Sequence, residues 1–217
     1  MSSFLESDIY FCNVGDRLVF LDVAADRYFC LNPAAEAAFV RATEQPSEVD
    51  RDVPHDGLAT NWLADRIPIS CAAPPLPEKG VLDEPLKPLG MTPLAVALCD
   101  LATCRARLRL LGMRRTLAWI RHWKTRVADH VDDALPERLF ETMAAFAAAN
   151  GVVTSLDNCL SQSIAIAARL LKRSISVDLV VGVRLGPFNA HCWVQRDDWL
   201  VNDRVDTVRM FTPILVI

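Results

Sequence analysis

The sequence lacks any apolar run of the roughly 18 residues that a membrane-spanning helix requires. It also lacks a basic N-terminal region followed by an apolar stretch, so we expect neither a signal peptide nor a membrane partner. The seven cysteines are odd in number and form no CxxC pair, which predicts reduced thiols in a cytoplasmic protein. The net charge of −4 does not favour a nucleic-acid partner, because such proteins usually carry a basic face.

What the chain does have is apolar content. Its 217 residues are 52% hydrophobic, which is ample for one large domain or two small ones with packed cores. Proline and glycine cluster between residues 71 and 90 without a helical period, as linkers do. We therefore expect an α+β fold with a first domain over residues 1–72, a Pro-rich linker over 73–90 and a second domain over 91–217.

The N-terminal residues predict a small three-stranded meander. Aromatic and β-branched residues fill Ile9–Cys12, Arg17–Leu21 and Arg27–Leu31, and turn residues separate these runs. A helix should follow, with Asn32 as N-cap and Pro33 at its first position. A second helix is expected near residues 57–66. The first domain is thus predicted to be a sheet packed on helices.

The C-terminal residues predict helices first and strands afterwards. Cap signals and apolar spacing favour helices over 92–111, 115–127, 136–149 and about 155–173. Ile175–Leu185 alternates apolar and polar side chains, which predicts a strand with one buried face. Phe211–Ile217 should form a last short strand.

One cysteine lies where a helix begins. Ser155 or Asp157 can cap the predicted helix, so Cys159 falls in its first turn. There the unpaired backbone N–H groups and the positive end of the helix dipole favour a thiolate, which is the nucleophilic form of cysteine.

A histidine and an aspartate follow on a predicted hairpin. His191 and Asp203 lie on two apolar runs separated by residues 196–198. If those three residues are the loop, His191 stands directly opposite Asp203 on one face, about 4.5–5.5 Å away between Cβ atoms. A loop of even length would put them on opposite faces. A Cys-His-Asp triad therefore predicts an odd-length turn.

Less specific interpretations exist for each of the three residues. Cys159 could be a small buried hydrophobe, His191 a core histidine, and Asp203 a turn or surface carboxylate. The three could also bind zinc, but a structural zinc site wants four ligands and no fourth is evident, so we expect no metal.

The second half resembles a known family. The runs Asn158–Leu160, Asp178–Val183 and Ala190–Val194, together with Asp203, are similar to lasso-peptide B proteins, which are transglutaminase-like cysteine peptidases. The resemblance covers roughly residues 90–217 and implies a transglutaminase-like, papain-like α+β domain. It implies Cys159 as nucleophile, His191 as general base and acid, and Asp203 as the orienting residue. Cys192 departs from the small residue expected at that position.

The first half resembles a second family. Val14–Asp22 and Arg27–Pro33 are similar to PqqD-like peptide-recognition domains of winged-helix type, over about residues 8–70. Such domains hold the leader of a precursor peptide as an added strand, because an exposed strand edge offers backbone hydrogen bonds. By analogy the receiving residues are in the third strand: Arg27, Tyr28, Phe29, Cys30 and Leu31.

Together these features predict a leader peptidase for a ribosomally made lasso-peptide precursor. The resemblance implies no cofactor, a precursor peptide as substrate, and an ATP-dependent lasso cyclase as a partner. Two alternatives stay open: a non-catalytic chaperone that only binds the precursor, and an acyl transferase of transglutaminase type. The acyl transferase would use the same thioester intermediate as the peptidase.

Overall fold

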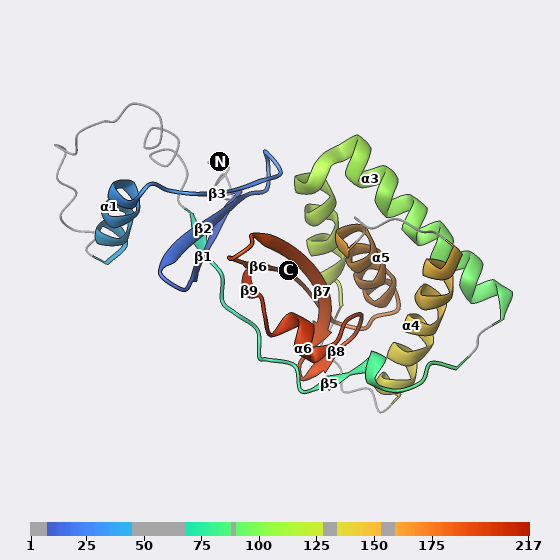
Figure 1. Cartoon of the computed structure of the whole chain (residues 1–217). Helices are drawn as coiled ribbons and strands as arrows, with labels where there is room; N and C mark the ends of the chain where they lie inside the picture. The colour runs from blue at the N-terminus through green and yellow to red at the C-terminus, as the bar shows by residue number, and fades with distance from the viewer. Residues whose placement is uncertain (1–7, 45–67, 88–89, 128–133, 153–158) are drawn as a thin grey trace.

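A computed structural model describes residues 8–44, 68–87, 90–127, 134–152 and 159–217. It shows a mixed α+β architecture with two sheets. Figure 1 shows the order across the molecule: helix α1, the first sheet, the second sheet, and then helices α3, α4 and α5. The expected N-caps Ser155 and Asp157 and the expected helix at 57–66 lie outside the described residues.

The first sheet is the predicted meander with one strand added. Its strands are β1 (Ile9–Val14), β2 (Arg17–Asp22), β3 (Arg27–Cys30) and β4 (Ile69–Ser70), in the order β3-β2-β1-β4. The expectation of three strands was wrong, since β4 pairs in parallel with β1. Sequence reasoning missed β4 because it is only two residues long and lies at the end of the expected first domain, just before the linker.

The two faces of this sheet contact different partners. One face carries Phe11, Phe20 and Phe29, which pack with Phe39 of α1 (Pro33–Glu44). The predicted cap of α1 is confirmed, because the Asn32 side-chain oxygen accepts a 2.9 Å hydrogen bond from the Ala35 N–H. The other face joins the main core of the second half through Tyr10, Cys12, Val19 and Leu21.

Three long helices form one side of the second half. They are α3 (Met91–Lys124), α4 (Leu135–Val152) and α5 (Cys159–Lys172). The predicted break between the first two helical runs is confirmed, because α3 is interrupted at Gly112, whose φ of 75° is the left-handed value that glycine tolerates. α5 is apolar along most of its length, and nine of its residues are buried.

The second sheet packs against α5. Its strands are β5 (Lys79–Gly80), β6 (Asp178–Arg184), β7 (Asn189–Arg196), β8 (Trp199–Leu200) and β9 (Thr212–Val216), in the order β5-β8-β7-β6-β9. Two short helices accompany the sheet: η1 (Val81–Asp83) follows β5, and α6 (Val205–Val208) lies between β8 and β9 in the chain. The predicted last strand is confirmed as β9, which pairs with β6.

β6 is buried on both faces, so the expectation of one buried side was wrong. Leu179, Val181 and Val183 face the main core, whereas Val180 joins a second cluster with Trp193 and Phe211. The second cluster also includes Leu200 of β8 and Val208 of α6, and the local sequence of β6 does not predict these distant contacts.

The two halves are held together by more than the connecting chain. β1 and β2 contact β9 directly, and Arg121 of α3 donates a 2.6 Å hydrogen bond to the Tyr10 hydroxyl. The segment expected as a linker contributes β5 to the second sheet, and its Pro75 carbonyl accepts a 2.9 Å hydrogen bond from Gln195. Val81, just after β5, is fully buried. None of the described helices is long and apolar enough to cross a bilayer.

Candidate active site

The hairpin that carries the histidine has a two-residue loop. Arg196 pairs with Trp199 and Gln195 with Leu200, which leaves only residues 197 and 198 in the turn. The predicted odd-length turn was therefore wrong. Asp197 makes the shorter turn possible, because its φ of 51° is the positive value that two-residue hairpin loops require and that aspartate tolerates.

If β8 continued in this register, Asp203 would not lie opposite His191. Extending the ladder from Leu200 would set Asp203 opposite Cys192, on the face away from His191. The chain avoids this because β8 ends at Leu200 and bends over residues 201–203. The first part of β7 consequently lies at the margin of the sheet, and there Asp203 meets the histidine.

Asp203 and His191 are in contact even though the register of the hairpin differs from the predicted one. Asp203 Oδ2 lies against His191 Nε2 in a short hydrogen-bonded ion pair. The second carboxylate oxygen accepts a 2.7 Å hydrogen bond from the Arg204 N–H. Burial alone would raise the pKa of Asp203, but the hydrogen bonds from His191 and Arg204 outweigh it and leave that pKa lowered. The aspartate is thus held as a carboxylate facing the ring.

The histidine is tuned to stay protonated. The hydrogen bond that His191 donates to Asp203, and then the one shared with Cys159, raise the pKa of His191 to about 9, against the opposing effect of burial. Since Nε2 faces the carboxylate, Nδ1 is the ring nitrogen left for the thiol. Near neutral pH the ring is therefore an imidazolium placed between a carboxylate and a sulfur.

The cysteine is tuned in the opposite direction. Cys159 is the first residue of α5 and is exposed. Its pKa is lowered, first by the hydrogen bond from His191, then by the charge of the imidazolium and by backbone hydrogen bonds from Leu160 and Cys192; burial opposes this. A thiolate beside an imidazolium is the nucleophilic form of cysteine at neutral pH.

Two aromatic rings pack against the imidazole. Phe211 lies with its ring centroid 5.1 Å from that of His191, and Trp193 stacks at 6.2 Å. The sequence pattern had indicated Trp193, which shares a face with His191 along the strand. It gave no signal for Phe211, which is twenty residues away in sequence. Gly182 fits beneath Trp193, because a Cβ there would lie 2.7 Å from the indole ring.

The five residues expected to bind peptide are not equivalent. Leu31 is buried and Phe29 stacks on Phe20, so both pack the first sheet against α1. Arg27 and Cys30 are exposed. Tyr28 is the one that turns toward the second half.

Tyr28 brings the first sheet to the edge of the candidate site. Its ring lies 5.4 Å from that of Phe188, just before β7, and Phe188 is 49% exposed. Burial raises the pKa of the Tyr28 hydroxyl, and its proximity to the ionisable groups of Cys192, Asp26 and Cys159 adds to the rise. Sequence reasoning had no means to find Phe188, because its partner comes from the other half of the chain.

Cys192, the departure from the resembled family, points away from the candidate triad. It is buried in the main core, where desolvation raises the pKa of its thiol. A neutral buried thiol is an inert packing group, so it does not compete with Cys159 as a nucleophile.

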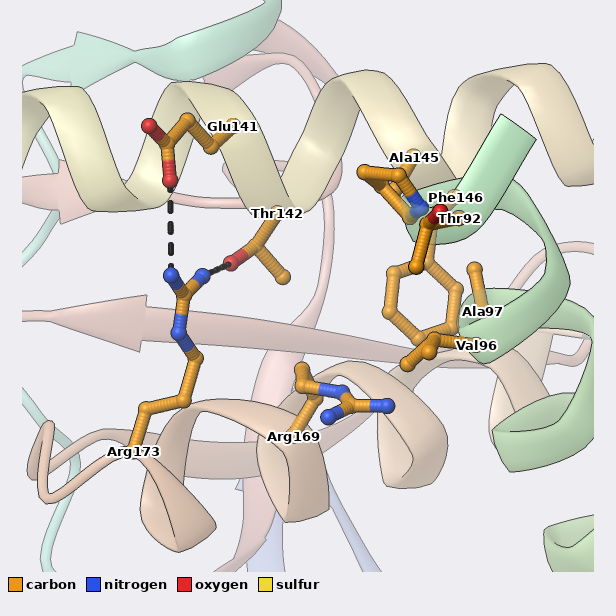
Figure 2. Close-up of a pocket in the computed structure, with 10 residues that line it drawn as sticks. Thr92, Val96, Ala97, Glu141, Thr142, Ala145, Phe146, Arg169 and Arg173 are labelled. Carbon is orange, nitrogen blue, oxygen red and sulfur yellow. Dashed lines mark hydrogen bonds and ion pairs between the residues drawn. The ribbon is translucent and has the colours of Figure 1, made fainter. Parts of the chain in front are cut away.

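A separate hollow lies at the far end of α5. It has a volume of about 420 Å³, and Figure 2 shows its lining residues from α3, α4 and α5. Arg173 contacts Glu141 at 3.4 Å and Thr142 at 3.3 Å across it. Arg173 is fourteen residues after Cys159, about 21 Å along the helix axis. The hollow is therefore distinct from the site at Cys159. Within the described ranges no group of three or more His, Cys, Asp or Glu side chains could hold a metal ion.

Comparison with known proteins identifies the second half. The family model described as the transglutaminase-like superfamily matches residues 98–216, a stretch that includes Cys159, His191 and Asp203. No curated protein and no solved structure matches the chain.

Proposed function

The chain belongs to the transglutaminase-like superfamily, and on that premise we propose that it is a thiol peptidase with Cys159, His191 and Asp203 as its catalytic triad. The observation that carries the proposal is the contact of three side chains from three elements at the open margin of β7. Opposed changes in pKa within one group of side chains are typical of acid and base partners in catalysis.

The first chemical step forms a thioester. The Cys159 thiolate attacks the carbonyl carbon of the scissile peptide bond, and His191 gives its proton to the leaving amine nitrogen as the C–N bond breaks. Asp203 keeps the imidazole in the right orientation and offsets its charge. The Cys159 backbone N–H is the natural first donor to the oxyanion.

The second step releases the acyl group. Water attacks the thioester carbonyl while His191 accepts one of its protons, and the thiolate leaves. The acyl product is a new carboxylic acid, which releases its proton to solvent and becomes a carboxylate, and the enzyme returns to its starting charge. An amine in place of water would give an amide and make the protein an acyl transferase.

For the substrate we propose the leader region of a lasso-peptide precursor. The support is the resemblance of the N-terminal residues to PqqD-like domains, together with the position of β3 as the outermost strand of the first sheet. A leader segment added beside β3 would run past Tyr28, whose ring lies at the edge of the candidate site. Tethering the leader there raises the local concentration of the scissile bond.

The freed core peptide would pass to an ATP-dependent lasso cyclase, which we propose as a partner. This step follows from the resemblance alone. The cyclase would take the new N-terminal amine of the core, which the peptidase step produces.

The test is incubation of the wild-type protein with a precursor peptide encoded beside its gene, followed by mass spectrometry. Cleavage at one leader–core junction, with a free carboxylate on the leader, supports the peptidase. A leader that ends in an amide when an amine is present would support the acyl transferase. Binding without any change in mass would contradict both and leave the precursor-binding chaperone.

A further inference from the structure

Along the first part of β7, side chains supply hydrogen-bond partners that a neighbouring strand would otherwise provide. In an antiparallel ladder the outward N–H and C=O groups of Cys192 and Val194 would bond to the next strand. β8 is only two residues long and ends before it can supply all of them. Buried backbone N–H and C=O groups need hydrogen-bond partners. The side chains that take the place of the missing strand therefore show how this part of β7 is held.

Asn202 supplies one of the missing partners. The Val201 N–H donates to the Val194 carbonyl at 2.9 Å, which continues the ladder by one bond. The reciprocal acceptor in a regular ladder would be the Val201 carbonyl. Instead the Val194 N–H donates to Asn202 Oδ1 at 2.7 Å. This substitution allows the main chain to turn away at residue 202 and carry Asp203 toward His191.

Ser163 supplies a second partner and ties the helix to the strand. Its hydroxyl donates to the Cys192 carbonyl at 2.7 Å, and it accepts a 2.9 Å hydrogen bond from Asn202 Nδ2. Ser163 is fully buried and lies one turn after Cys159 on the same side of α5. The other outward group of Cys192, its backbone N–H, is directed at the Cys159 sulfur.

These bonds form one chain from the nucleophile's helix to the loop of the aspartate. We propose that Asn202 and Ser163 are positioning residues that fix α5, β7 and the 201–203 bend relative to one another, and so set the distances within the triad. Neither side chain touches the scissile bond. The proposal rests on the proposed function for its catalytic consequence, but its geometric part concerns the reactivity of Cys159 alone.

The proposal predicts specific effects of Asn202→Ala. Turnover of the precursor should fall about 100-fold with little change in KM, because the substrate-binding surface is untouched while the reacting groups are displaced. Alkylation of Cys159 by iodoacetamide at pH 7 should slow about tenfold, as the titration of the thiol moves toward the free-cysteine pKa near 8.5. Site-resolved mass spectrometry over a pH series measures this shift.

Thr116→Val is the matched control. It removes a buried hydroxyl, as Ser163→Ala does, together with its 2.8 Å hydrogen bond from Thr116 Oγ1 to the Gly112 carbonyl, but on α3. It should lower the unfolding temperature by a similar amount and leave the alkylation profile of Cys159 unchanged. An equal shift of the profile in Thr116→Val would overturn the proposal, because it would reduce the effect to general destabilisation.

Ser163→Ala gives a second, milder test that keeps the bond between Val194 and Asn202. It should shift the alkylation profile of Cys159 in the same direction, and the double variant with Asn202→Ala should lose no more than the worse single variant, since both interrupt one chain. Folded variants with wild-type turnover and an unshifted profile would refute the positioning role. If the wild type cleaves no precursor, the proposed function fails, while the alkylation profile of Cys159 still decides the role of Asn202.

Discussion

Replacing Asp203 by asparagine isolates the contribution of its negative charge. The carboxamide keeps an oxygen that can accept from His191 Nε2, so the change removes the charge and spares the shape. With a pKa of about 9, about 97% of the imidazole is protonated at pH 7.5; at an ordinary 6.5 only about a tenth would be. Because the imidazolium stabilises the Cys159 thiolate, the ion pair at pH 7.5 should become up to about tenfold scarcer.

The assay is the pH dependence of precursor cleavage and of Cys159 alkylation. In the wild type both should rise as pH passes the lowered pKa of the thiol, and cleavage should fall as pH passes about 9 and the imidazolium loses its proton. In Asp203→Asn the alkaline limb should move to lower pH. Asp206→Asn is the control, since it removes the same charge from an exposed position three residues later. An alkaline limb that stays near pH 9 in Asp203→Asn would refute the reasoning.

Three further changes test other parts of the structure. Gly182→Ala should cost about 1–3 kcal/mol of folding free energy and lower cleavage, because the new methyl would displace the Trp193 ring that stacks on the histidine; thermal unfolding and turnover measure the two effects, and an unchanged protein would contradict them. Arg173→Ala should leave turnover unchanged and alter the free energy of unfolding by less than about 1 kcal/mol, since its partners are at the far end of α5. Removal of residues 1–72 should cost at least about 3 kcal/mol, or roughly 6–12 °C in Tm, because the first sheet contributes to the main core; a truncated protein as stable as the whole chain would show that the halves are independent.

The sequence predicted most of the elements because the signals behind them are local. The Asn32 cap, the glycine break at Gly112 and the aromatic and β-branched runs of the first three strands each depend on a few neighbouring residues. The short strands β4 and β5 escaped prediction because two residues carry no periodicity, and their pairing depends on distant partners.

The candidate site was predicted through a mistaken register. Counting along an assumed three-residue loop set His191 opposite Asp203, whereas the turn has two residues and the contact depends on a bend after Leu200. Turn length depended on whether Asp197 would adopt a positive φ, which spacing does not reveal. The neighbouring Asn202 could have been noticed as a strand-ending residue, but its partners on α5 and β7 are visible only in three dimensions.

The most direct test of the central claim compares wild-type protein with Cys159→Ala in turnover of the same precursor peptide. Both proteins should fold and bind the leader equally, because Cys159 is exposed at the start of its helix. The account predicts cleavage at one leader–core junction by the wild type and none by Cys159→Ala. Cleavage at that junction by Cys159→Ala at the wild-type rate would contradict it, because the thiolate would then not be the nucleophile.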